Sequence, residues 1–132
     1  MFQLLIGIIF AVMIFIGHVE ATDTSYMSLK QFRELESGAI DKSVGSPLVT
    51  IYLGGSIEAL GLVNAILEKN KQAPLFCMPA SGLTAQKVRV LIESYIQKNR
   101  NILSAKDFSL FEETMNVGAA TVAVLMESYP CK

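Results

Sequence analysis

Histidine and cysteine are scarce in this sequence, and their scarcity excludes most familiar active-site chemistry. The only histidine of the 132-residue chain is His18, inside an apolar N-terminal segment. Without that segment the protein has no imidazole, so it lacks the commonest general base near neutral pH and the Ser-His and Cys-His nucleophilic pairs. Cys77 and Cys131 are the only cysteines, which excludes a Cys-x-x-Cys redox motif and leaves zinc an unusual set of two thiolates and carboxylates. We therefore expect a protein that is not an enzyme and has no cofactor and no metal site.

A nucleotide loop and a basic surface are missing as well. The pattern Gly-x-x-x-x-Gly-Lys-Ser/Thr does not occur, and residues 22–132 carry 11 basic and 11 acidic residues once Glu20 is set aside with the N-terminal segment. A domain with a formal charge of zero has no electrostatic footprint for nucleic acid or anionic lipid. We expect no nucleic-acid partner.

The N-terminal segment, residues 1–21, has the pattern of a secretory signal peptide. Residues 4–16 are nearly all apolar, and the segment ends in Ala21 with Val19 two positions earlier, a pattern typical of a cleavage site. The run falls short of the ~20 apolar residues that span a bilayer, and no cysteine follows it to carry a lipid. We expect export, cleavage after Ala21 and no stable membrane insertion afterwards. An uncleaved anchor is the alternative, because no Lys or Arg precedes the apolar run.

The two cysteines predict a disulfide, because an even number of cysteines in an exported domain is usually paired. Only one intramolecular pairing is possible, between Cys77 and Cys131. Closing a loop of this length stabilises a fold by about 4 kcal/mol in the chain-entropy model. Residues 22–132 have the size of one ordinary domain, and we expect this bond to be its main covalent support.

Hydrophobic periodicity predicts helices and no strand. The first helix is expected to begin at Ser28, in a capping box, and to end at Gly38. A polar connection over residues 41–45 then leads to the second helix. Ser46 is expected to be its N-cap and Pro47 its first residue, and it is expected to end at about Asn70.

Two further helices are predicted beyond a loop over residues 70–83. Thr84 is expected to cap the third, and the fourth is expected to run without a break from a cap at Ser104 to Pro130. The resulting fold class is all-α, a compact domain of four to five helices with one disulfide, preceded by an N-terminal signal peptide.

The second helix is expected to present two different faces. Its core-facing stripe is predicted to contain Leu48, Tyr52, Gly55, Ala59, Leu62, Val63 and Ile66. Its opposite, more polar stripe is predicted to contain Thr50, Gly54, Glu58, Gly61, Asn64 and Glu68. Glycine inside a helix costs about 1 kcal/mol relative to alanine, and close helix packing over Gly55 and Ala59 is the expected reason for its presence. A bare surface on which a partner docks is the alternative.

The later helices are assigned surface charges and an apolar stripe. Arg89 and Glu93 have the spacing of an exposed i,i+4 pair, and Glu112 and Glu113 are expected to be solvated near a helix start. The core stripe of the fourth helix is predicted to contain Phe108, Phe111, Met115, Ala119, Val122 and Met126.

Several short motifs occur in a recognisable order. They are Tyr52-x-x-Gly55-x-x-Glu58, Phe76-Cys77-Met78-Pro79, Thr84 with Gln86, Tyr95-Ile96 and Tyr129-Pro130-Cys131. In this order and spacing they resemble the Rap1a/Tai family, whose members include immunity proteins of the type VI secretion system. The resemblance covers residues 52–131. The sequence departs from the family pattern at Glu58, where the family has Asp, at Arg100, where a proline often stands, and in one extra residue between Cys77 and Thr84.

The resemblance implies an all-helical domain in the periplasm of a Gram-negative bacterium, with Cys77 joined to Cys131. It also implies a cognate secreted toxin as the partner, such as a type VI peptidoglycan amidase that is bound and occluded, and a possible homodimer. The sequence does not identify partner-binding residues. The loop over residues 70–83 and the polar stripe of the second helix are the candidates, because loops carry function more often than cores do.

A periplasmic acid-stress chaperone is the alternative function. Such a protein would partly unfold below about pH 3, as its carboxylates protonate, and expose apolar surface to client proteins. This chain has an ordinary number of carboxylates, which favours the immunity interpretation over the chaperone interpretation.

Overall fold

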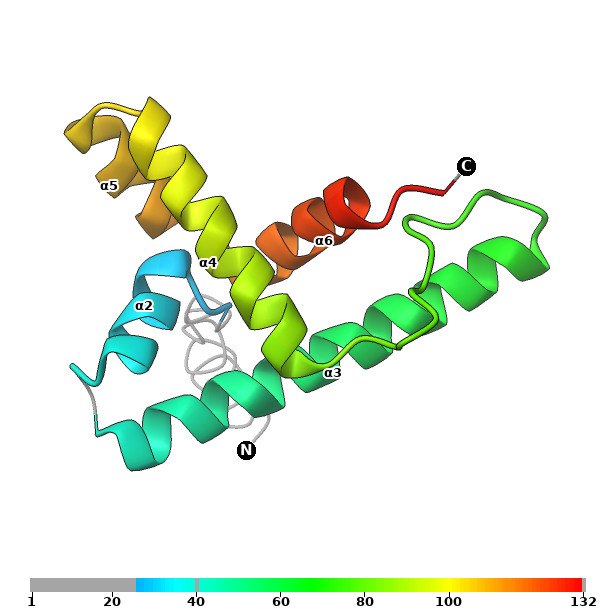
Figure 1. Cartoon of the computed structure of the whole chain (residues 1–132), viewed down its shortest axis with the longest axis horizontal. Helices are drawn as coiled ribbons and strands as arrows, with labels where there is room; N and C mark the ends of the chain where they lie inside the picture. The colour runs from blue at the N-terminus through cyan, green and yellow to red at the C-terminus, as the bar shows by residue number, and fades with distance from the viewer. Residues whose placement is uncertain (1–25, 40, 132) are drawn as a thin grey trace, which may run out of the picture.

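Five helices and no strand make up the secondary structure of residues 26–39 and 41–131, the part of the chain that the computed structural model describes (Figure 1). The predicted signal peptide, residues 1–21, lies outside the described residues. The helices are α2 (Leu29–Ser37), α3 (Lys42–Lys69), α4 (Ala85–Ile102), α5 (Ala105–Thr114) and α6 (Val117–Ser128). The predicted all-α class with four to five helices is therefore confirmed.

Helix α2 begins and ends at the residues predicted from the sequence. The Ser28 hydroxyl accepts a hydrogen bond from the Gln31 backbone N–H at 3.2 Å, and the Gln31 side chain accepts one from the Ser28 N–H at 2.9 Å, which completes a capping box. Gly38 ends the helix with a left-handed φ of 78°, a conformation that glycine adopts without steric cost. Leu29 and Phe32 are fully buried on its inner face.

The predicted start of the second helix was wrong, because α3 begins at Lys42, more than one turn before Pro47. Asp41 is the N-cap, and its side chain accepts a hydrogen bond from the Ser43 N–H at 2.9 Å. These bonds to Ser43 lower the pKa of the Asp41 carboxyl below its ordinary value of 3.8. Pro47 lies inside the helix, where its ring removes a single backbone hydrogen bond. The connection predicted over residues 41–45 is therefore part of α3 from Lys42 onward.

Gly45 is the position at which α2 and α3 need a glycine. A Cβ atom there would lie 2.6 Å from the Leu35 carbonyl oxygen, whereas a Cβ at Gly54 would meet nothing within 4 Å. We expect Gly45→Ala to lower the free energy of unfolding by about 1–3 kcal/mol, because backbone must move to admit the methyl group. The matched change Gly54→Ala should raise it by about 1 kcal/mol through helix propensity alone. Urea titration of both variants measures the difference, and equal effects would contradict the packing at Gly45.

The predicted fourth helix is two helices. Asn116 separates α5 from α6, and its side-chain oxygen accepts a hydrogen bond from the Ala119 N–H at 2.7 Å. The chain breaks here because its backbone pairs with the segment at the start of α2. The Leu29 N–H donates to the Met115 carbonyl at 3.0 Å, and the Val117 N–H donates to the Met27 carbonyl at 2.8 Å. The restart changes the phase of the apolar stripe.

The predicted stripe of the fourth helix was accordingly correct in α5 and partly wrong in α6. Phe108 is buried and Phe111 packs against the core, but Ala119 is exposed and Met126 is 47% exposed. The residues that α6 buries are Val117, Ala120, Thr121, Val124 and Leu125.

The predicted core face of α3 was also wrong. The α3 side chains that belong to the core or pack against it are Val49, Tyr52, Leu53, Ile57 and Leu60. Tyr52 is the one predicted residue among them. The true stripe is displaced from the predicted one by one residue, a rotation of about 100° around the helix axis. The rest of the predicted stripe faces solvent, with Ile51 beside it 72% exposed and Leu62 within it 63% exposed. A Cβ atom at Gly55 would meet nothing within 4 Å, so the prediction that Gly55 permits close packing inside the domain was wrong.

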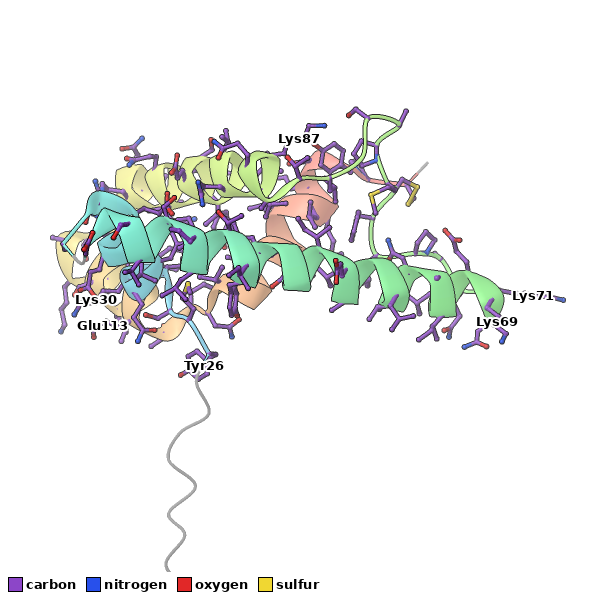
Figure 2. All side chains as sticks on the ribbon, turned by 90° about the horizontal axis from the view of Figure 1, so that it is seen from below. Tyr26, Lys30, Lys69, Lys71, Lys87 and Glu113 are labelled. Carbon is purple, nitrogen blue, oxygen red and sulfur yellow. A yellow bond between two sulfur atoms is a disulfide. The ribbon has the colours of Figure 1, made fainter. Side chains whose placement is uncertain are left out.

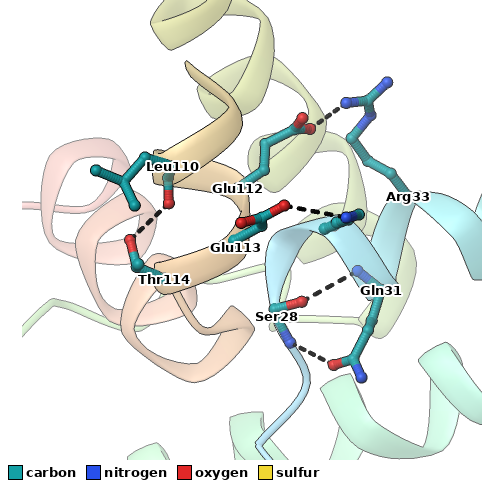
Figure 3. A network of polar contacts seen from close by, with 8 residues as sticks. Ser28, Gln31, Arg33, Leu110, Glu112, Glu113 and Thr114 are labelled. Atoms are coloured by element: carbon teal, nitrogen blue, oxygen red, sulfur yellow. Dashed lines mark hydrogen bonds and ion pairs between the residues drawn. The ribbon is translucent and has the colours of Figure 1, made fainter. Parts of the chain in front are cut away.

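Charged side chains join α2 to α5, far apart in the sequence (Figure 3). Lys30 Nζ lies 3.1 Å from Glu113 Oε1, and Arg33 forms an ion pair with Glu112. The hydrogen bond to Glu113 and the charge of that carboxylate raise the pKa of the exposed Lys30 ammonium. Glu112 is only 8% exposed, so the prediction that it is solvated was wrong. The ion pair with the Arg33 guanidinium offsets the desolvation cost of burying the Glu112 carboxylate.

Candidate functional site

The segment between α3 and α4 is an exposed loop. It begins at the end of α3, which projects beyond the other helices (Figure 1). Asn70 caps α3, and Lys71 follows with a positive φ of 58°. The Gln72 N–H donates to the Leu67 carbonyl at 2.8 Å, which satisfies a free carbonyl of the last helical turn. The chain thus turns back sharply along α3.

Asn64 holds the returning chain against α3. Its Nδ2 donates to the Phe76 carbonyl at 2.7 Å, and its Oδ1 accepts from the Leu75 N–H at 2.8 Å. The side chain is 8% exposed, so these bonds take the place of water for both of its polar atoms. Asn64 was predicted to lie on the polar stripe of the second helix, and this prediction was wrong because the residue is buried. The sequence signal for a buried Asn64 was its position as a single amide within the otherwise apolar run of residues 59–67.

Two further contacts fix the middle of the loop. Phe76 is 1% exposed and belongs to the hydrophobic core. The predicted disulfide between Cys77 and Cys131 is present, with a Cα–Cα distance of 5.0 Å, and the Cys77 N–H donates to the Tyr129 carbonyl at 2.8 Å. The loop is therefore joined to α3, to the core and to the segment after α6.

The end of the loop is held by α4. Gly82 has a φ of 69°, and its N–H donates to the Pro79 carbonyl at 2.8 Å. Lys87 lies beside the turn (Figure 2), with its Nζ 2.8 Å from Ser81 Oγ and 2.9 Å from the Gly82 carbonyl. Thr84 caps α4 as predicted, accepting from the Lys87 N–H at 3.2 Å.

The outward side of the loop is exposed while its inner side is pinned. Lys71, Gln72, Met78 and Ser81 are all exposed, and Met78 is 50% exposed. A surface already held in one conformation loses little entropy when a partner binds it. Its chemistry is that of recognition, with one cation, amide and hydroxyl groups and a flexible thioether side chain.

A concave region lies between α2 and α4, with a volume of about 350 Å³. Its lining includes charges of both signs, among them Lys30, Glu34 and Glu93. Within the described residues no group of three or more His, Cys, Asp or Glu side chains lies close enough to hold a metal ion. The groove can accept a polar group, but its charges are already engaged in part by the contacts of α2 with α5.

The predicted surface pair of Arg89 and Glu93 is replaced by longer-range contacts. Arg89 Nη2 donates to Thr50 Oγ1 at 2.9 Å and to the Ser46 carbonyl at 3.3 Å, and its Nε lies 3.4 Å from Glu36 Oε2. Arg89 therefore links α4 to both α2 and α3. Thr50, a member of the predicted polar stripe, takes part in this internal contact, which leaves the loop as the better of the two predicted partner surfaces.

Comparison with models of known protein families, with curated proteins and with solved structures gave no match to this chain.

Asn64 tests whether the loop depends on its side-chain contacts. We expect Asn64→Ala to lower the free energy of unfolding by about 2–3 kcal/mol, because it leaves the Leu75 N–H and the Phe76 carbonyl without partners. The control is Asn99→Ala, which removes an amide that donates only to the Tyr95 carbonyl within its own helix. Hydrogen exchange at Leu75 should accelerate in the first variant only. Unchanged exchange there would show that Asn64 does not hold the loop.

Proposed function

We propose that this chain is an exported, periplasmic immunity-type protein that binds and occludes a cognate secreted toxin, such as a type VI peptidoglycan amidase. The observation that carries the proposal is the loop over residues 70–83, exposed on its outer side and fixed on its inner side. Proteins that inhibit by occlusion commonly present such a preorganised segment to the partner's groove. The order of short motifs between residues 52 and 131 supports the same function through its resemblance to the Rap1a/Tai family.

Inhibition of this kind requires no chemistry in the inhibitor. The loop would fill the toxin's active-site groove, with Met78 at its exposed centre as an adaptable apolar contact. Lys71 and Ser81 would supply polar contacts around it. The disulfide would keep the loop in its binding conformation in the oxidising periplasm.

The test is co-expression of the exported chain with the product of the adjacent gene, followed by an assay of peptidoglycan hydrolysis. We expect a stoichiometric complex in which hydrolysis is abolished. Met78→Asp should weaken inhibition about a hundredfold, because it places an unpaired carboxylate in the interface. The control is Leu110→Asp on α5, at the other end of the molecule (Figure 1), where the side chain is 61% exposed.

Two results would overturn the proposal. Undiminished inhibition by Met78→Asp would remove the loop from the interface. The absence of any complex, together with protection of client proteins from aggregation near pH 3, would replace the immunity function with that of an acid-stress chaperone.

A further inference from the structure

The ion pairs of the described chain are concentrated on one short helix, α2. Three of the four join α2 to another helix, and two of these three are drawn in Figure 3: Lys30 with Glu113, Arg33 with Glu112, and Glu36 with Arg89. The fourth joins Lys98 on α4 to Glu127 on α6. The carboxylates that support the tertiary structure are therefore gathered around α2.

In each of the three α2 pairs the acid is the partner that can lose its charge. Carboxylic acids protonate as the pH falls towards about 4, whereas an arginine guanidinium keeps its proton throughout. The hydrogen bond to Glu113 and the charge of that carboxylate raise the pKa of the Lys30 ammonium, so Lys30 also stays charged in acid. Acid therefore removes the negative charge of every pair and leaves the three cations.

Two of these pairs are shielded from water. Glu112 is 8% exposed, and the side chains of Arg89 and Glu36 are 13% and 19% exposed. Loss of one charge from a buried pair is costly, because the other charge is left without a partner or water. The exposed pair of Lys30 with Glu113 contributes little by comparison. We therefore expect the response to acid to come mainly from Glu36 and Glu112.

The pair of Arg89 with Glu36 is incompletely hydrogen-bonded even when both groups are charged. Arg89 Nε lies 3.4 Å from Glu36 Oε2, but among the described residues neither Arg89 Nε nor Glu36 Oε1 has a hydrogen-bond partner. Both atoms are buried. An unsatisfied buried polar atom carries a desolvation cost, and movement of α2 away from α4 would let water reach both of them.

The groove between α2 and α4 is lined by charges of both signs. They are Lys30, Arg33, Glu34, Glu36 and Glu93. Arg89 of α4 adds a third cation beside Glu36. At neutral pH the carboxylates neutralise these cations, but acid removes the negative charges together. Three cations then remain around the groove, and their repulsion favours separation of α2 from α4.

The described contacts with the other neighbouring helices do not counter this effect. Helix α5 contributes Glu112 and Glu113, which are themselves acids. Helix α3 contributes the Thr50 hydroxyl and the Ser46 carbonyl to the contacts of Arg89, and neither group is charged. The surroundings of α2 therefore become more positive from every side as the pH falls.

Few other contacts hold α2 in place. Leu29 and Phe32 are the only buried residues among its nine. The bond from the Leu29 N–H to the Met115 carbonyl, at 3.0 Å, involves backbone alone and does not titrate. The N-terminal end of α2 would therefore stay attached while the rest of the helix moved. Phe32 and Ile96, which line the groove and are buried, would then meet solvent.

We propose that α2 is an acid-responsive flap. When Glu36 and Glu112 protonate, α2 separates from α4 and α5 but remains attached at its N-terminal end, and Phe32 and Ile96 become exposed. The loop over residues 70–83 keeps its structure, because the disulfide and the hydrogen bonds of Asn64 that hold it contain no ion pair. Helix α2 lies at the opposite end of the molecule from this loop (Figure 1), so the flap is distinct from the surface proposed to bind a toxin.

Amide hydrogen exchange followed by NMR tests the flap. Protection factors correct each amide for the pH dependence of its intrinsic exchange rate, so α2 can be compared with the other helices at every pH. Between about pH 7 and pH 3.5 we expect protection in α2 to fall at least about tenfold, while that of Val88 and Ile92 in α4 and Leu125 in α6 changes less than about threefold. Unchanged protection in α2 would overturn the proposal. So would a parallel loss in α2, α4 and α6, which would show unfolding of the whole domain.

Glutamine variants imitate the protonated acids at neutral pH. Glu36→Gln and Glu112→Gln should each lower the protection of α2 at least about tenfold at about pH 7, because each leaves a guanidinium without its counter-charge. Glu127→Gln is the matched control, since it breaks the described ion pair that does not involve α2, and it should leave α2 protected. An equal loss of α2 protection in all three variants would contradict a role specific to Glu36 and Glu112.

An apolar variant tests the flap from the opposite direction, and it serves if a glutamine variant fails to fold. Replacing both partners of a buried ion pair with apolar side chains is often neutral or stabilising. The variant combines Arg33→Met, Glu36→Met, Arg89→Met and Glu112→Met. Its α2 helix should stay protected at about pH 3.5, because the two buried pairs can no longer titrate. Loss of α2 protection in acid despite these changes would overturn the proposal. None of these measurements uses toxin inhibition, so the flap and the immunity function fail or succeed separately.

Discussion

Replacing Phe76 with alanine is expected to lower the free energy of unfolding by about 3–5 kcal/mol, because it empties a fully enclosed site in the core. Phe76 is 1% exposed, although it lies in a loop rather than a helix. Its carbonyl also accepts the hydrogen bond from Asn64 at 2.7 Å. Loss of the ring therefore removes both the core contact and the anchor that positions this hydrogen bond.

The measurement is urea unfolding followed by circular dichroism. Met78→Ala is the matched control, two residues further along the same loop and 50% exposed, and it should change stability by less than about 0.5 kcal/mol. If Phe76→Ala cost no more than this control, the loop would not be anchored in the core.

Removal of the disulfide, by the double variant Cys77→Ser with Cys131→Ser, is expected to cost about 4 kcal/mol in the chain-entropy model. The two cysteines are 54 residues apart, so the bond restricts a large part of the unfolded chain. Domains of this kind have total stabilities of about 5–15 kcal/mol, and the double variant should therefore unfold at a much lower urea concentration.

Reduced protein with the natural sequence is the comparison for this variant, and its stability should match that of the double variant. The bond also fixes the loop, so reduction should weaken the proposed toxin inhibition under conditions in which the helices remain folded. Undiminished stability after reduction would show that the hydrogen bond between Cys77 and Tyr129 and the burial of Phe76 hold the loop without it.

Features governed by short-range hydrogen bonds were predictable from the sequence. The capping box at Ser28, the left-handed Gly38 and the caps at Thr84 and Ser104 each involve residues within a few positions of one another. Such contacts depend little on the rest of the fold. These helix termini were therefore assigned correctly, although the helix that begins after Ser104 ends at Thr114 and does not continue to Pro130.

The faces of α3 were not predictable in the same way. This helix is apolar on several sides, so periodicity alone does not distinguish a buried stripe from an exposed one. The break at Asn116 was missed because its cause is the pairing with the segment around Ser28, a contact distant in sequence. Asn64 was misplaced for a related reason, since its partners, Leu75 and Phe76, belong to a loop.

The pairing of α2 with α5 has a consequence for folding kinetics. The ion pair between Lys30 and Glu113 joins residues separated by 83 positions, and the bridge from Ser28 to Asn116 joins the same regions. The entropic cost of closing so long a segment arises before these contacts can stabilise the fold. Folding rates therefore fall as contacts become less local in sequence. This chain should therefore fold more slowly than helical bundles of similar length whose neighbouring helices pack in sequence order, which lengthens its exposure to proteases before the domain closes.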